Sequence, residues 1–568
     1  MNQPSPAIVT QEAVRRLPRW ALLLLCVAYV VPGYVGRAPW KNADIASFGY
    51  MLALLEASSW QDWLRPTVMG MVPEGGALLP YWLGAWAMQL LVPLGVAPDF
   101  AVRVPYALML AGTLAATWYA VYHLARHPSA QPVAFAFGGE ASPTDYARAL
   151  ADGSLLALIA TLGLAQFSHE TTPALAQLFF GALVFYGLAA LPTRALQSTL
   201  ALLAGLVGLT LSGAPYTALI YAGLSLLGVA LPGAADLSDA ARRRGLLVLL
   251  ALAAGCVGLA LGLDLFRWQI APWRTGWTEW RGLIKLFMWF TWPAWPLVLW
   301  TLWRWRRQLP ALRRQRHLGL PLVIASVPVL STVAPLAGDR ALLLALPALA
   351  ALAALALPTF SRSAASLIDW FTVLFFSGWA VVIWVVWVAM ETGFPATPAA
   401  NVARLAPQFQ PLFQWPAFVA ATLATLAWIA LARWRTGRHR TALWKSLVLP
   451  AAGATLCWLL LMTLWLPALD YGRSYAPQMR EVRRLVGDAS CVEVHGLGTP
   501  QLTAVRFHGG WEPVPARGPV DCPWLLVHAD AQASLPATVT LSHWRLAGEV
   551  KRPTDRADTL LVFRRVLK

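Results

Sequence analysis

The sequence is dominated by about thirteen apolar runs, each close to the roughly 20 residues that a helix needs to cross a bilayer. Lipid offers no hydrogen bonds to a backbone, so runs of this length favour helices. Hydrophobic residues make up 58% of the chain and charged residues only 12%, about half the usual charged fraction of soluble proteins. We expect an all-α polytopic membrane bundle with spans at 20–36, 101–125, 151–168, 173–192, 198–213, 215–232, 246–264, 286–304, 319–336, 340–358, 367–390, 416–433 and 445–467.

Basic residues predict the orientation of these spans. Arginines gather in short loops at 242–244, 304–316 and 433–440, and loops rich in Lys and Arg face the cytoplasm. All three loops face that side only if the apolar stretch 77–95 lies at the interface and does not cross. We therefore expect a bacterial inner-membrane protein with a cytoplasmic N-terminus and a long periplasmic loop, 37–100.

The net charge of +17 does not indicate a nucleic-acid-binding protein. The basic residues flank apolar runs, where they anchor helices and attract anionic lipid head groups. No small-residue cleavage site follows the run from Trp20 to Tyr34, so we expect a retained first helix and no cleaved signal peptide.

The last hundred residues differ from the rest of the chain. We divide the chain into a membrane domain, 1–467, and a small periplasmic α/β domain, 468–568. A helix is predicted over 475–487, and short β-rich runs follow: CVEVHG, LTAVRFHGG, PWLLVHA, VTLSHWRL and TLLVFRRV. A disulfide between Cys491 and Cys522 is compatible with a periplasmic tail, but the sequence leaves the pairing open.

Candidate acids lie between the apolar runs on the predicted outer side. Asp44 opens an amphipathic stretch and is either a first-turn acid favoured by the helix dipole or a carboxylate that accepts a proton or holds a metal ion. Glu74 precedes Gly75-Gly76, a pair that forms a turn or lets the backbone approach a ligand. His169 and Glu170 occupy a tight turn between two spans, but this pair alone is a weak zinc signal.

Candidate cations lie on the same side. Arg103 begins a span, and it either meets a phosphate or extends to water. In the loop 265–285, Arg274 and Lys285 alternate with tryptophans, as expected of a lipid-phosphate site or of an interfacial belt. Arg340 follows Asp339 at an outer turn, where the two could form only a local ion pair. The sequence contains no Walker loop, dinucleotide fingerprint, GxSxG or CxxC motif.

In their order along the chain, these features resemble the GT-C membrane glycosyltransferases. They are most like the ArnT/PMT type, the lipid A aminoarabinose transferases and protein O-mannosyltransferases of glycosyltransferase family 39. Short family motifs match loosely: W-x-x-D-E-x-R-Y at Trp40–Ser47, E-K-P-x-x-x-Y-W at Glu74, Tyr81 and Trp82, A-x-R-L-P at Ala101–Pro105, T-K-G-P at Leu211–Pro215, the outer PW at Trp292-Pro293, and K-x-x-x-Y-x-L-P-x-x-P-x-L-A at Arg340–Leu349.

The resemblance implies transfer of a sugar from a polyprenyl-phosphate donor to a membrane lipid or protein acceptor at the periplasmic face. Asp44 and Glu170 are then the catalytic candidates, and Arg103, Arg274 and Lys285 would hold the donor phosphate. The candidates Glu74, His169 and Arg340 add to this set. Whether a divalent metal ion is bound is left open. The chain departs from the family at Ala43, where the leading catalytic Asp stands, and at Gly75 or Gly76, where the motif Lys stands.

Two other classes remain as alternatives. A lipid-linked sugar transporter or flippase would also be polytopic and rich in arginine, but it should show internal repeats and broken helices. A GT-C-like protein without catalysis is the other alternative, and Ala43 is its best support.

Overall fold

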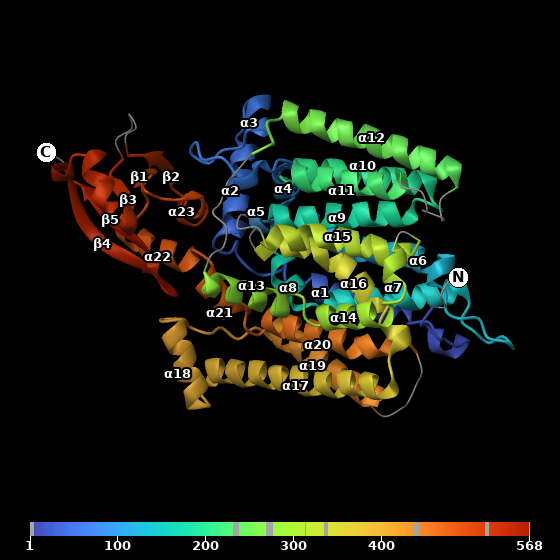
Figure 1. Ribbon diagram of the computed structural model, residues 1–568. Helices are drawn as coiled ribbons and strands as arrows, with labels where there is room; N and C mark the ends of the chain where they lie inside the picture. The colour runs from blue at the N-terminus through green and yellow to red at the C-terminus, as the bar shows by residue number, and fades with distance from the viewer. Residues whose placement is uncertain are drawn as a thin grey trace.

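In the computed structural model, residues 5–230, 238–267, 276–312, 314–333, 339–436, 442–516 and 522–566 are described. They form a helical bundle whose long helices run side by side. The N-terminus lies at one end of this bundle, and a mixed β-sheet domain formed by the C-terminal part of the chain lies at the other (Figure 1). The expected polytopic helical membrane protein with a small C-terminal α/β domain is confirmed.

A helix falls within each predicted span. The long or paired helices are α1 (Arg19–Val30), α5–α6 (Pro98–Ala101 and Arg103–Ala125), α7 (Pro143–Ala160), α8 (Leu162–Phe167), α9 (Pro173–Ala190), α10 (Ala195–Leu211), α11 (Pro215–Ala230), α12 (Asp239–Gly262), α13 (Trp277–Phe290), α14 (Ala294–Arg304), α15 (Arg316–Val333), α16 (Leu346–Ala354), α17 (Arg362–Thr392), α19 (Trp415–Thr436), α20 (Lys445–Leu461) and α21 (Leu466–Arg473).

Fewer of these helices qualify as single spans than the thirteen predicted. Among the described residues, seven are long and apolar enough to cross a membrane, or up to nine if two bent pairs each count as one span. One bent pair is α13 and α14, which meet at 85° next to Pro293. Several other predicted spans correspond to shorter apolar helices, such as α1 with 12 residues.

The stretch 77–95 forms α4 (Leu79–Leu91) and a 3-10 turn. With 13 residues, α4 is about 20 Å long, which is shorter than the roughly 30 Å of bilayer hydrocarbon. It lies at the same end of the bundle as α2 (Ala43–Leu55), α3 (Trp60–Leu64) and the sheet domain (Figure 1).

The sheet has five strands in the order β2-β1-β3-β5-β4. Strand β1 (Cys491–His495) pairs in parallel with β2 (Glu512–Pro515) and β3 (Trp524–His528), and β5 (Asp555–Arg565) pairs antiparallel with β3 and β4 (Trp544–Arg552). The predicted helix over 475–487 is α22 (Ala476–Val486). Cys491 and Cys522 form a disulfide with a Cα–Cα distance of 5.7 Å.

The predicted run LTAVRFHGG contains no strand, and in VTLSHWRL strand β4 begins only at Trp544. Residues 502–510 form the end of α23 (Thr499–Ala504) and a π-helical turn (Val505–Gly509). This segment lies between the tail and the bundle, so its apolar side chains face two different cores. Leu502 and Val505 pack into the tail core, while Phe507 meets Phe48 of the bundle with ring centroids 4.8 Å apart.

Helix α2 joins the bundle to the tail. Ile45 belongs to the hydrophobic core of the tail, whereas Phe48 belongs to the core of the bundle. Gly49 faces Thr503 so closely that a Cβ there would lie 2.0 Å from the threonine hydroxyl. The tail therefore rests directly on the helix whose first turn carries Asp44.

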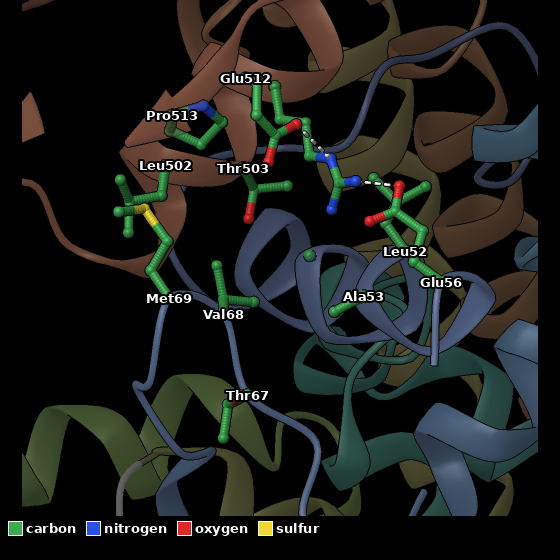
Figure 2. Close-up of a pocket in the computed structure, with 12 residues that line it drawn as sticks. Leu52, Ala53, Glu56, Thr67, Val68, Met69, Leu502, Thr503, Glu512 and Pro513 are labelled. Atoms are coloured by element: carbon green, nitrogen blue, oxygen red, sulfur yellow. Dashed lines mark hydrogen bonds and ion pairs between the residues drawn. The ribbon is translucent and has the colours of Figure 1, made fainter. Parts of the chain in front are cut away.

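A pocket of about 240 Å³ borders this contact. Figure 2 shows Glu56 of α2 and Glu512 of β2 pointing toward one guanidinium between them, which is that of Arg506. These ion pairs add an electrostatic contact at the edge of the junction between α2 and the tail.

Candidate functional site

Asp44 lies in the first turn of α2 and is 1% exposed. Its Oδ1 accepts two hydrogen bonds of 2.8 Å, from the backbone N–H and the hydroxyl of Thr171. Its Oδ2 accepts from the Trp40 backbone N–H at 2.9 Å and from Arg37 at 2.6 Å. The carboxylate thus joins the first loop to the turn between α8 and α9, and four donors occupy its two oxygens.

Arg37 is the buried counter-ion of Asp44, and each side chain is 2% exposed. Its Nε donates to the Gly33 carbonyl at 3.0 Å, and its two Nη groups donate to the carbonyls of Ala38 at 3.2 Å and His169 at 2.6 Å. A buried ion pair is stable only when such additional bonds satisfy its remaining polar groups. This network fixes the C-terminal end of α1 against the turn that carries Glu170.

Two opposing effects act on the pKa of Asp44. Burial raises it, whereas the Arg37 charge and the hydrogen bonds from Arg37, Trp40 and Thr171 lower it to about 2. The group is therefore ionised at neutral pH and is a weak base. Its geometry suits the positioning of two loops better than proton abstraction.

Glu170 is held differently. It is 7% exposed, and its Oε2 accepts from Nε and Nη2 of Arg340 at 3.1 and 2.6 Å. Within the described ranges, no hydrogen bond reaches its Oε1. Arg340 also lies over the Phe167 ring at 5.0 Å, and its side chain is 36% exposed. The pair therefore combines a buried carboxylate with a cation that reaches solvent.

The environment of Glu170 keeps its proton affinity high. Burial raises the pKa of this carboxyl, the Arg340 charge lowers it, and the nearby Asp44 charge raises it again. A carboxyl whose pKa is raised toward neutrality is better suited to general base catalysis than one whose pKa is lowered. Of the two predicted acids, Glu170 has the more suitable electrostatics.

A second half-buried cation lies nearby. Arg473 of α21 lies over the Trp40 ring at 5.0 Å, and Arg37 lies over the same ring at 4.7 Å. Arg473 is also close enough to Glu170 for the two charges to interact. Arg340 and Arg473 together supply positive charge next to the acid.

His169 serves as packing within this site. Its ring is 2% exposed and contacts the rings of Tyr29, Tyr34 and Trp458, with centroids 5.5, 5.0 and 4.6 Å away. A Cβ on Gly33 would lie 2.2 Å from the His169 ring, so only glycine fits there. Burial lowers the pKa of His169 to about 4, so the ring is neutral at pH 7.

Arg103 is buried at the flank of the cluster. Its Nη2 lies 3.3 Å from Asp99, and its Nη1 donates to the Tyr34 carbonyl at 3.5 Å. Because the residue is 2% exposed, a phosphate would have to displace neighbouring groups to reach it.

The remaining predicted residues are not brought into the cluster by any described contact. Lys285 is exposed on α13. Arg274 lies outside the described residues. Glu74 begins the 3-10 turn Glu74–Gly76, and its side chain is likewise not described.

The donor set does not favour a resident metal ion. Among the described residues, no three His, Cys, Asp or Glu side chains gather closely enough to hold one. Both oxygens of Asp44 already accept hydrogen bonds from N–H and O–H donors. The Asp44 oxygens are therefore already occupied where a metal ion would need them.

Sequence reasoning missed Arg37, Thr171 and Arg473 as parts of this site. Arg37 is separated from Asp44 by only seven residues, and an isolated cation after an apolar run could have been paired with that acid. Thr171 lies 127 residues from Asp44 in the sequence, so no local pattern predicts its two hydrogen bonds.

No family model matches the chain, and a search of curated proteins finds no match. Two solved structures do match: the crystal structures of ArnT from Cupriavidus metallidurans in the apo state and bound to undecaprenyl phosphate. Sequence identities are 14% and 15%, and TM-scores 0.57 and 0.55. Each match covers 96% of this chain and 98% of the ArnT chain. Over nearly its whole length, the protein therefore shares the fold of the membrane glycosyltransferase ArnT.

Proposed function

We propose that this protein is an integral-membrane glycosyltransferase that moves a sugar from a polyprenyl-phosphate donor to a lipid A-like or protein acceptor. The observation that carries the proposal is the Glu170–Arg340 pair, a buried acid beside a solvent-reaching cation, at the sheet-domain end of an ArnT-like fold. A structurally similar ArnT was crystallised with undecaprenyl phosphate, which supports a donor of this class.

In this proposal, Glu170 is the base and Asp44 is a positioning residue. An acceptor hydroxyl oxygen attacks the anomeric carbon of the donor sugar, and the bond from that carbon to the phosphate oxygen breaks. The electron pair leaves with the polyprenyl phosphate, and the hydroxyl proton passes to Glu170. If the acceptor is itself a phosphate, its oxygen is already anionic and no proton needs to be removed.

The leaving phosphate gains charge during this step and needs cations that do not rearrange. Arg340 and Arg473 lie beside Glu170 and are partly accessible, so they are our first choice. Arg274 and Lys285 remain candidates for the same phosphate from the neighbouring loop and α13. Arg103 is better suited to supporting the loop that holds Arg37, because its own charge is buried beside Asp99.

We further propose that the sheet domain is periplasmic and the N-terminus cytoplasmic, in a bacterial inner membrane. Arg242–Arg244 lie in the first two turns of α12, and Arg304 and Arg435 lie in the last turns of α14 and α19. These helix ends lie at the end of the bundle opposite the sheet domain (Figure 1). The positive-inside rule assigns that end to the cytoplasm. The disulfide between Cys491 and Cys522 suits an oxidising compartment on the other side.

The second candidate is a protein that binds the lipid-linked sugar without transferring it. The observation in its favour is Ala43, which stands where the family has its leading catalytic Asp, next to an Asp44 whose oxygens are occupied. This candidate would bind the lipid-linked sugar without transferring it, whereas the enzyme would transfer the sugar to an acceptor.

The test is mass spectrometry of envelope glycolipids and glycoproteins from a deletion strain. The strain is complemented with wild type or with Glu170→Gln at equal expression. A sugar increment that returns with wild type only supports the transferase and identifies the sugar by its mass. If deletion changes no increment while the purified protein binds undecaprenyl phosphate, the non-catalytic candidate takes its place.

A further inference from the structure

A groove of about 790 Å³ opens between α1, α6 and α7. Its volume is within the roughly 300–1,000 Å³ of typical small-molecule sites. The cations at its mouth come from the start of α1, near the N-terminus, at the end of the bundle opposite the sheet domain (Figure 1). The mouth of the groove therefore lies at the opposite end of the bundle from the cluster around Glu170, while its far end reaches Val30 and Val31 at the C-terminal end of α1.

The mouth of the groove is basic and aromatic. Arg19 begins α1, Arg16 lies just before this helix, and Arg148 lies in the second turn of α7. Trp118 and Tyr119, in the last two turns of α6, also line the groove. Arginine with Trp or Tyr is the combination that membrane proteins place at lipid head groups.

Two acids reduce this positive charge without cancelling it. Asp152 lines the groove, and its Oδ1 accepts from the Trp118 indole N–H at 2.8 Å. Asp145 lies 3.5 Å from Arg16 and 3.6 Å from Arg148. Three arginines therefore face two carboxylates, which leaves a surplus of one positive charge at the mouth.

Below the mouth, the groove becomes apolar along the length of α1. From Arg19 to Val31 the wall formed by α1 is about 18 Å long, a length that suits a single acyl chain. Leu23 and Val27 of this wall are 64% and 55% exposed. An acyl chain would cover these side chains and fill the space between the helices.

We propose that this groove binds a single glycerophospholipid with an anionic head group from the leaflet on the N-terminal side. The phosphate would meet Arg16, Arg19 and Arg148, and one acyl chain would follow the apolar wall. The surplus positive charge favours an anionic lipid over a zwitterionic one. The length of the groove, about 18 Å, favours an acyl chain over a much longer polyprenyl chain, most of which would project beyond the groove.

The probe is native mass spectrometry of the full-length protein after lipid has been removed in detergent. Equal amounts of phosphatidylglycerol and phosphatidylcholine with identical chains are added, and undecaprenyl phosphate is added in a separate arm. We expect one tightly retained phosphatidylglycerol on wild type. An arginine near an anionic head group contributes about fivefold in affinity, so Arg19→Gln with Arg148→Gln should reduce the preference by about 25-fold.

Two further variants make the result specific. Ala115→Trp fills the groove from α6 and should abolish retention of the lipid without altering surface charge. Arg15→Gln is the matched control, because Arg15 is a neighbouring exposed arginine that does not line the groove, and it should bind lipid like wild type. Thermal unfolding of each variant shows that it remains folded.

The proposal is overturned if phosphatidylcholine and phosphatidylglycerol are retained equally. It is also overturned if Arg15→Gln loses as much binding as the double variant, since surface charge alone would then explain the result. A third result would also overturn the proposal. If undecaprenyl phosphate displaces phosphatidylglycerol and Ala115→Trp abolishes its retention, the groove binds a polyprenyl phosphate. None of these results depends on whether Glu170 catalyses transfer.

Discussion

Thr171 donates two hydrogen bonds of 2.8 Å, from its backbone N–H and its hydroxyl, to a single carboxylate oxygen of Asp44. The other oxygen binds Arg37 and the Trp40 backbone. The acid that the family resemblance marks as catalytic is therefore the group that holds two distant loops together. We therefore expect a change of Asp44 to affect mainly the stability of the fold, and a change of Glu170 to affect mainly the transfer reaction.

Asp44→Asn should destabilise the fold. The change leaves the buried Arg37 without its counter-ion, and breaking a buried pair in this way costs about 3–5 kcal/mol. Thermal unfolding in detergent, followed by tryptophan fluorescence, measures the loss. Glu12→Gln is the control, because its pair with Arg15 is 4.0 Å long and highly exposed. Equal unfolding temperatures for wild type and Asp44→Asn would show that the pair does not support the fold.

The contribution of Asp44 should depend on pH in the acid range only. Folding lowers its pKa from 3.8 to about 2, so the stabilisation is fully present above pH 3.8 and is lost as pH falls toward 2. The difference in unfolding temperature between wild type and Asp44→Asn should be constant from about pH 8 to about pH 5 and should shrink below about pH 4. A difference that changes mainly near neutral pH would assign the effect to another group.

Glu170→Gln should impair transfer while leaving the protein folded. Loss of a general base typically lowers the rate by about 10²–10⁴-fold, whereas a glutamine oxygen still accepts from Arg340. Initial rates with a polyprenyl-phosphate-linked sugar measure the effect. Glu56→Gln, which changes another Arg-paired glutamate at the exposed edge of α2, serves as the matched control.

The pH–rate profile gives an independent check on Glu170. Because burial raises the pKa of Glu170 above its ordinary value of 4.5, the wild-type rate should rise with pH through a pKa above 4.5. The residual rate of Glu170→Gln should lack this step. An identical acid limb in both proteins would remove Glu170 from the role of base.

Gly49→Val should separate α2 from the tail. A Cβ at this position would lie 2.0 Å from the Thr503 hydroxyl, so either the helix or the tail must move. We expect lower thermal stability and faster proteolysis of the tail. Gly49→Ala should show a smaller effect, and Thr503→Ala added to it should restore part of the loss, since the clashing oxygen is then absent. Equal effects of Gly49→Ala with and without Thr503→Ala would contradict this contact.

Removing the disulfide with Cys491→Ser and Cys522→Ser should loosen the sheet domain. The cross-link joins two residues with a sequence separation of 31. For a loop of this length, the chain-entropy model predicts that the disulfide stabilises the folded domain by about 3–4 kcal/mol. Unfolding temperatures measured with and without reductant report this stabilisation. Reductant should lower the value for wild type and leave that of the double variant unchanged.

The apolar runs predict the bundle because their length and composition reflect the lipid around them. They do not predict where a helix breaks, as α13 and α14 do beside Pro293. Asp44 and Glu170 were identified from the sequence, but their roles depend on partners as remote as Thr171 and Arg340, which only the folded chain brings near.

In the tail, the predicted strand over 502–510 fails for a similar reason. Alternating apolar residues usually indicate one buried face, but here Leu502 faces the tail core and Phe507 faces Phe48 of the bundle. A segment placed between two cores follows neither core's periodicity, so its sequence resembles a strand while its backbone is helical.

Ile45 packs among the buried residues of the tail although it is more than 400 positions upstream of them. A fragment cut at residue 468 would therefore lack part of its own interior and would expose the surface that α2 normally covers. Because α2 precedes the tail in the sequence, the ribosome makes the surface on which the tail packs before it makes the tail itself.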